Sequence, residues 1–122
     1  MVINNKTLVI GGSENPARYS NMAIRALRKN GIETTSLAKR TGKVLDVDIL
    51  TVFPENDNIH TVTMYVGQQR QPEYYGKVLE LNPKRVIFNP GAENYEFAEI
   101  LENKGIETIE GCTLVMLSTG QY

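Results

Sequence analysis

Short apolar runs alternate with helix-like stretches along the whole chain. The run at 7–10 (TLVI) is stopped by two glycines, which is typical of a buried parallel strand. Between Ser20 and Gly31, apolar residues recur at helical spacing while basic residues point outward, which predicts a helix. Ser20 or Asn21 is its expected N-cap and Gly31 its C-cap.

The same alternation continues to the end of the chain. Further strands are expected at 32–37, 59–66, 84–88 and 106–109, with one or two more within 38–58. Helices are expected at 71–83, with Pro72 in the first turn, and at 95–105, with Asn94 as the N-cap. The tail at 112–122 fits either a short helix or an extended segment.

Strands separated by helices of about 10–15 residues imply right-handed crossovers and a parallel sheet. The expected fold class is therefore α/β. It is a Rossmann-like, doubly wound, mainly parallel sheet with helices on both faces, formed by residues 1–122 as a single domain.

Composition narrows the function classes. With 13 basic and 14 acidic residues the net charge is −1, so nothing in it favours nucleic acid or an anionic membrane as a partner. No apolar run approaches about 18 residues, and the N-terminus lacks a leader pattern. The single cysteine excludes an intrachain disulfide, and the expected location is cytoplasmic.

Ligands of doubly wound sheets bind beyond the carboxyl ends of the strands. The loop after the first strand, GGSENPARYS, combines glycines, a helix start and Arg18, which favours phosphate binding over a plain turn. The second strand ends in Lys39 and Arg40 rather than in an acid, which suits a phosphorylated ribose, as in NADP or coenzyme A (CoA). These two side chains also fit solvated loop charges.

The remaining strand ends are the segments VGQQRQ, NPGAEN and EGCT. None carries a catalytic set. Cys112 lacks a nearby base and is expected to be a buried, inert thiol, while His60 should lie at the opposite end of the sheet. Asp46 and Asp48 are expected to share one solvated strand face, and no cluster has the spacing of metal ligands.

Three stretches carry a resemblance: VIGGSENPARYSNMAIRALRKNGIE, KRVIFNPGAEN and GIETIEGCTLVML. They resemble the small, stand-alone CoA-binding proteins, which are similar to the N-terminal CoA-binding domain of the succinyl-CoA synthetase α subunit. The family loop reads approximately G-A-S-x-x-P-x-R, and residues 11–18 of this chain read GGSENPAR, with Gly12 at the position of the alanine.

The resemblance implies CoA or acyl-CoA as the ligand and assigns roles to twelve residues. Gly12, Ser13, Arg18 and Ser20 would contact the phosphates, and Lys39 or Arg40 the phosphorylated ribose. Val66 and Gly67 would line the adenine or ribose wall, and Asn89, Pro90, Gly91 and Cys112 the pantetheine side. The expected partner is this small-molecule nucleotide ligand; a homo-oligomer or an enzyme partner stays open.

Two alternatives stand beside a binding protein without a catalytic step. The first is a small NADP-dependent oxidoreductase that uses Tyr65, Tyr74 or Tyr75 as proton donor, although no Tyr-x-x-x-Lys signature is present. The second is a scaffold or interaction domain that binds no nucleotide. A ligand titration separates the three.

Overall fold

A computed structural model describes residues 5–55 and 58–122 of the chain. Seven strands form one sheet in the order β3-β4-β2-β1-β5-β6-β7. The strands are β1 (Thr7–Ile10), β2 (Thr34–Leu37), β3 (Gly42–Val44), β4 (Val47–Leu50), β5 (Thr61–Met64), β6 (Arg85–Phe88) and β7 (Glu107–Glu110). All neighbours are parallel except β3, which pairs antiparallel with β4. The expected α/β class is confirmed.

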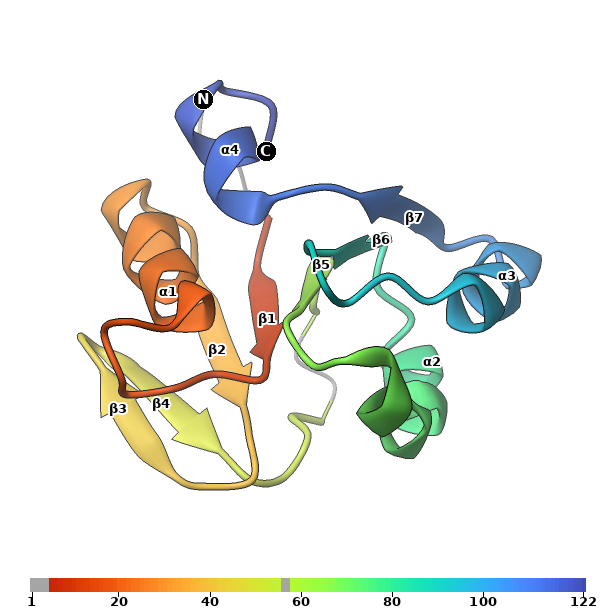
Figure 1. The fold of residues 1–122 in the computed structure, drawn as a ribbon, viewed down its shortest axis with the longest axis horizontal. Helices are drawn as coiled ribbons and strands as arrows, with labels where there is room; N and C mark the ends of the chain where they lie inside the picture. The colour runs from red at the N-terminus through yellow and green to blue at the C-terminus, as the bar shows by residue number, and fades with distance from the viewer. Residues whose placement is uncertain (1–4, 56–57) are drawn as a thin grey trace.

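Helices cover both faces of this sheet (Figure 1). They are α1 (Tyr19–Lys29), the 3₁₀ helix η1 (Gln68–Tyr74), α2 (Tyr75–Leu81), α3 (Tyr95–Asn103) and α4 (Thr113–Ser118). The core divides accordingly. Leu8, Val62 and Phe88 pack with residues of α2 and α3, whereas Val9 and Ile49 pack with residues of α1 on the opposite face. This alternation along β1 explains why TLVI is apolar at both face positions.

Two helix starts differ from the sequence-based expectation. The first helix begins at Tyr19, and Arg18 holds the N-cap position without a side-chain cap, so Ser20 and Asn21 lie inside the helix and are buried. Pro72 lies inside η1 instead of opening an α-helix. A proline has no N–H to donate. Because Pro72 lies in the 3₁₀ segment, before α2 begins, its missing N–H does not interrupt the hydrogen bonds of the α-helix.

Other expectations are met, in one case to within one residue. Asn94 caps α3 by accepting a hydrogen bond from the Phe97 N–H at 3.0 Å. The C-cap of α1 is Asn30, one residue before the expected Gly31, which follows it with φ of 73°, the left-handed conformation that ends many helices. Of the two forms open for the tail, the short helix α4 is the one observed.

The segment at 38–58 contains the β3–β4 hairpin, which adds an antiparallel edge to the sheet. Asp48 lies exposed on β4, but Asp46 lies in the turn between the strands, so the two carboxylates do not share a strand face. The Asp46 carboxylate instead accepts two hydrogen bonds of 2.9 Å from the guanidinium of Arg28 on α1. This pair connects the hairpin to the helix that follows the glycine loop.

Candidate functional site

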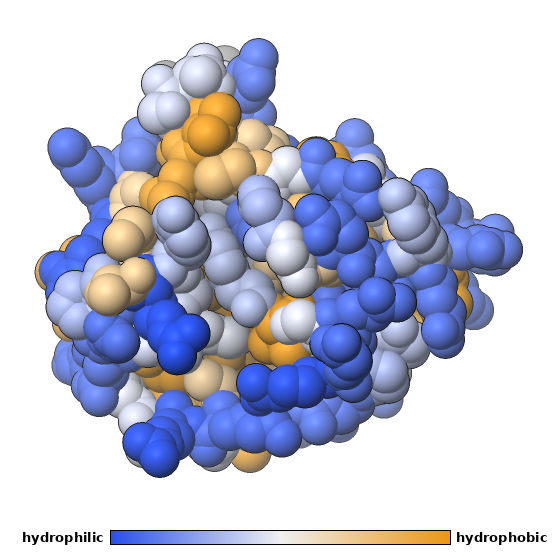
Figure 2. Space-filling model, in the orientation of Figure 1, coloured by the Kyte–Doolittle hydropathy of each residue, from blue (hydrophilic) through white to orange (hydrophobic). Residues whose placement is uncertain are grey.

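The chain reverses direction across the sheet at β1, which lies between β2 and β5. Ligands of open α/β sheets bind at such a switch point, outside the carboxyl ends of the strands. A cleft of about 1150 Å³ lies there. The loops after β1, β5 and β6 start in the middle of the view in Figure 1 and run outward from it, and Figure 2 shows hydrophobic residues there between hydrophilic ones.

The cleft brings together nearly all the residues that the sequence singled out. Eleven of them line it: Gly12, Ser13, Arg18, Ser20, Lys39, Arg40, Val66, Gly67, Asn89, Pro90 and Cys112. Gly91 is exposed and does not line the cleft. The loops after five strands therefore meet at one place.

The two glycines of the first loop serve the fold directly. Gly11 has φ of 97°, which a residue with a side chain rarely adopts. The N–H groups of Gly11 and Gly12 both donate to the Leu37 carbonyl, at 2.8 and 3.3 Å, so these two amides are not free for an anion. A Cβ on Gly12 would overlap the hydroxyl of Ser36 on β2. The glycine at 12 is therefore required for close packing of the loop against β2.

Free backbone donors lie further along the loop. Side chains hold its turn: the Asn15 N–H donates to Ser13 Oγ at 3.1 Å, and Asn21 Nδ2 donates to the Ser13 carbonyl at 2.8 Å. Within the described residues, four N–H groups between this turn and the first turn of α1 have no hydrogen-bond partner; they belong to Ser13, Glu14, Tyr19 and Ser20. Unpaired amides at a helix N-terminus are suited to bind an anion.

The arginines of the chain divide into two groups. In the part of the chain that the structure describes, the guanidinium groups of Arg18, Arg40 and Arg70 make no hydrogen bond or ion pair, and all three residues line the cleft. The other three arginines are engaged elsewhere, Arg25 with Asn21, Arg28 with Asp46, and Arg85 with Thr61 and Tyr122. The unpaired guanidinium groups are therefore concentrated around the cleft.

Two carboxylates near the cleft already have partners. Glu14 Oε2 accepts a hydrogen bond of 2.9 Å from the Lys43 N–H and so attaches the first loop to β3. Glu73 on η1 lies 3.5 Å from Lys39 Nζ, across the cleft from the β2 loop. The cleft lining itself contains four basic side chains and one acidic side chain, which favours an anionic ligand.

The inner end of the cleft is held by the buried amide of Asn89. Its Nδ2 donates to Thr63 Oγ1 at 2.7 Å and to the Met64 carbonyl at 3.0 Å, while its Oδ1 accepts from the Thr113 N–H at 2.9 Å. Asn89 thus ties the ends of β5 and β6 to the start of α4. Cys112, directly before α4, is half-buried rather than buried as expected, because it lines the cleft.

Burial affects the acidity of two of the tyrosines considered as proton donors. Burial raises the pKa of Tyr65 to about 12, although the hydroxyls of Thr113 and Thr63 lie close enough to lower it in part. Neither threonine makes a hydrogen bond of normal geometry with the phenol, which has no partner in the described residues. Burial also raises the pKa of Tyr74. Acid catalysis is most efficient when the pKa lies near the working pH, and burial shifts the pKa of both phenols away from it.

A second buried amide holds the other wall of the cleft. Gln71 on η1 is fully buried, and its Nε2 donates to the carbonyls of Val66 and Ala92 at 2.8 and 2.7 Å. Its Oε1 accepts from Asn94 Nδ2 at 2.9 Å. Gln71 therefore couples the loop after β5 to the loop after β6 and fixes the spacing of the cleft walls.

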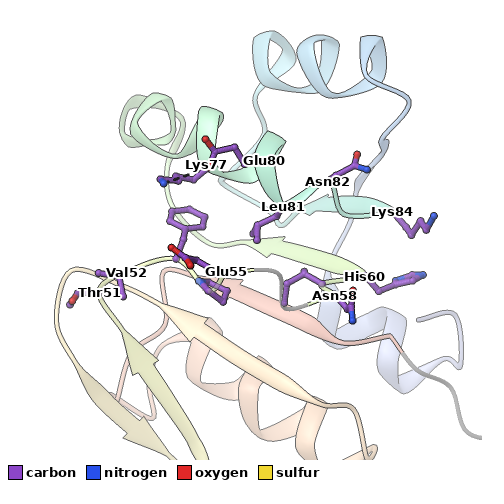
Figure 3. A pocket seen from close by; sticks show the side chains of 13 residues that line it. Thr51, Val52, Glu55, Asn58, His60, Lys77, Glu80, Leu81, Asn82 and Lys84 are labelled. Carbon is purple, nitrogen blue, oxygen red and sulfur yellow. Dashed lines mark ion pairs between the residues drawn. The ribbon is translucent and has the colours of Figure 1, made fainter.

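A second hollow of about 980 Å³ lies between residues 51–55, which follow β4, and the end of α2, with His60 and Lys84 at the amino ends of β5 and β6 (Figure 3). His60 lines it, as expected for a residue that precedes β5, and burial lowers the pKa of this imidazole. Its charged lining is mixed, with Lys77 and Lys84 beside Glu55 and Glu80. This hollow lies away from the switch point and lacks the predominantly basic lining of the cleft.

Sequence reasoning missed several residues of the cleft. Arg70 lies in the segment VGQQRQ, which its strand-end position had marked, and a basic residue there was the available signal. Tyr19 and Leu114 also line the cleft. Gln71 ends the same segment but does not line the cleft, and its role depends on contacts between loops far apart in sequence.

Within residues 5–55 and 58–122, no group of three or more His, Cys, Asp or Glu side chains is placed to hold a metal ion. None of the helices in this part of the chain is long and apolar enough to cross a bilayer.

Comparison with known proteins places the chain in a family. The family model described as "CoA binding domain" matches residues 5–118, and the chain belongs to that family. No curated protein matches the chain.

Solved structures share the fold. An uncharacterized protein is 42% identical, with a TM-score of 0.95 over 99% of this chain and 100% of its own. A hypothetical protein from Pyrococcus horikoshii OT3 is 20% identical, with a TM-score of 0.86 over 95% of this chain and 83% of its own. A Thermus thermophilus protein is 17% identical, with a TM-score of 0.86 over 98% and 91%. The resemblance inferred from the sequence and the Rossmann-like fold are thus confirmed.

Proposed function

We propose that the protein binds CoA or acyl-CoA in the cleft at the carboxyl ends of β1, β2, β5 and β6, with the ligand's diphosphate at the first loop. The observation that carries the proposal is the coincidence of three features at one place. These are the switch point of the sheet, four unpaired amides around the start of α1, and the three arginines that have no other partner. Together they provide donors and positive charge for phosphate oxygens.

The diphosphate is assigned to the donors that remain free after the loop has folded. These are the amides of Ser13, Glu14, Tyr19 and Ser20, together with the guanidinium of Arg18 at the N-cap position of α1. The helix dipole adds partial positive charge at the same end. Gly12 lines this part of the cleft without offering its amide.

The rest of the ligand follows the cleft toward α4. Val66, Gly67 and Tyr74 offer an apolar wall for the adenosine, and Asn89, Pro90 and Cys112 lie toward the pantetheine arm. Gly91 does not line the cleft, and we assign it a role only in the turn after Pro90, where its φ is 92°. We assign the chain a binding role without a catalytic step, in which the ligand is held for use by another protein.

The test is a thermal-shift and calorimetric titration with CoA, acetyl-CoA, 3′-dephospho-CoA, NADP and NAD. A ligand at 100 times its Kd should raise the free energy of unfolding by about 2.7 kcal/mol. In a domain of this size that corresponds to a rise in Tm of about 10 °C. Saturation by CoA and not by NAD supports the proposal. Binding of NADP alone would support the oxidoreductase alternative, and no response to any of them would leave the scaffold.

A variant of Arg18 locates the site. Arg18→Ala should weaken CoA binding by about 1.5–3 kcal/mol, the contribution of a hydrogen bond to a charged group. Lys29→Ala is the matched control, because Lys29 is an exposed cation at the other end of α1 and lies outside the cleft. Equal affinities of the two variants would remove Arg18 from the binding site.

A further inference from the structure

We propose that Arg70 on η1 is a specificity-determining residue that recognises the 3′-phosphate of CoA. This inference rests on the proposed function, since it assigns one part of the same ligand. Arg70 was not among the residues that the sequence singled out, and it lines the cleft on the wall opposite the first loop.

The geometry of η1 directs Arg70 toward the β2 loop. In a 3₁₀ helix the side chains at positions i and i+3 lie on the same side, so Arg70 and Glu73 share one side of η1. That side is identified by the ion pair of Glu73 with Lys39, which follows β2, at 3.5 Å. Arg70 therefore lies beside the residues that follow β2 and forms with them the rim cluster, which we define as Lys39, Arg40 and Arg70.

Within the rim cluster, the three cations are not equally free. Lys39 is paired with Glu73, whereas Arg40 and Arg70 make no hydrogen bond or ion pair with any described residue. The guanidinium also presents two parallel donors that match a phosphate, which an ammonium does not. The position best suited to a second phosphate is therefore between the two arginines rather than at Lys39.

The cleft then has two places for anions. The first, at the start of α1, has Arg18 and unpaired amides; the second, at the rim cluster, has side-chain cations from the β2 loop and η1. CoA carries a diphosphate and a separate 3′-phosphate on its ribose, whereas 3′-dephospho-CoA keeps only the diphosphate. Loss of a rim cation should therefore affect CoA and leave 3′-dephospho-CoA unaffected.

The experiment compares both ligands by calorimetry on wild type, Arg70→Gln and Lys77→Gln. Lys77 is the matched control because it is an exposed cation on α2, directly after η1, and lies outside the cleft. We expect Arg70→Gln to raise the Kd for CoA about tenfold, the loss of one charge-assisted hydrogen bond. The Kd for 3′-dephospho-CoA should stay at its wild-type value, and Arg70→Lys should restore part of the loss.

A second variant at the same part of the cleft should strengthen CoA binding instead of weakening it. Glu73→Gln removes the carboxylate beside Arg70 and releases Lys39, so it should tighten binding of CoA and leave 3′-dephospho-CoA unchanged. An unchanged affinity for CoA in Glu73→Gln would place this side of η1 away from the 3′-phosphate and contradict the proposal.

The calorimetric results distinguish an error in the role of Arg70 from an error in the proposed binding of CoA. If wild type binds CoA but Arg70→Gln weakens both ligands equally, Arg70 contacts a part they share and the inference is wrong. If Arg70→Gln changes neither, Arg70 is not at the ligand. If wild type binds neither ligand, the proposed function itself is wrong, and the inference fails with it.

Discussion

Gly12 offers the sharpest test of how the first loop is built. The structure indicates that Gly12→Ala destabilises the fold, because the new methyl would occupy the position of the Ser36 hydroxyl. Ser36 is buried on β2, and its Oγ donates to the Val9 carbonyl at 2.9 Å. A larger residue at position 12 therefore disturbs the pairing of β1 with β2 before it reaches any ligand.

The expected loss of stability in Gly12→Ala has two parts, a broken hydrogen bond and an overpacked site. Rotation of Ser36 away from the methyl breaks its hydrogen bond to Val9, which costs about 0.5–1.5 kcal/mol. An extra methyl in a well-packed site costs about 1–3 kcal/mol more. Gly12→Ala should thus lower the free energy of unfolding by about 2–4 kcal/mol, and Tm by about 8–16 °C in a domain of this size.

A double-mutant cycle with Ser36→Ala isolates this clash. In the double variant the overlapping oxygen is gone, and the remaining contact is with the Cβ of residue 36 at 3.2 Å. The double variant should be more stable than the sum of the single effects implies, by about 1–2 kcal/mol. Urea unfolding followed by circular dichroism measures all four proteins.

Gly67→Ala is the control for this cycle. Gly67 lies in the same cleft with φ of −62°, and a Cβ there would approach only Gln69 Oε1, at 3.6 Å. That variant should be as stable as wild type. A Gly12→Ala protein as stable as Gly67→Ala, or a cycle without coupling, would refute the packing explanation for the glycine at position 12.

Three further predictions address separate parts of the molecule. Asn89→Ala should destabilise the fold by about 2–4 kcal/mol, because the Thr113 N–H and other buried groups lose their partner; a loss below about 1 kcal/mol in urea unfolding would show that the buried groups find other partners. The Arg28 guanidinium lowers the pKa of Asp46, so the pair stabilises the fold above the unfolded-state pKa of this carboxyl, and the stabilisation disappears as pH falls through the folded-state value. Asp46→Asn should therefore be less stable than wild type at neutral pH and equal to it in strong acid, and a difference that persists in acid would contradict the pairing. CoA should slow alkylation of Cys112, the single cysteine, because the half-buried thiol lines the cleft; an unchanged rate, measured by mass spectrometry, would place the ligand elsewhere.

The sequence was sufficient for the features that depend on local pattern. Buried parallel strands read as apolar runs, and the asparagine cap of α3 and the glycine after α1 have local signatures. Strand ends of a parallel sheet meet at one edge, so eleven of the twelve candidate residues line one cleft.

Features that depend on contacts between distant segments could not be predicted. The Leu37 carbonyl, from the next strand, takes the amides of Gly11 and Gly12, so the loop offers different donors from those its glycines suggest. Ser20 and Asn21 are of residue types that often cap helices, but both lie within the first turn of α1 and are buried there. Arg70 became a candidate only once η1 was seen to face the loop after β2.

The central claim is that CoA binds at the switch point with its diphosphate at the start of α1. The most direct measurement is amide chemical-shift mapping by NMR during a CoA titration. We expect saturable shifts of the amides of Ser13, Glu14, Tyr19 and Ser20, with little change around His60 and Lys77 in the second hollow. Shifts confined to that second hollow, or no shifts at saturating CoA, would contradict binding at the switch point.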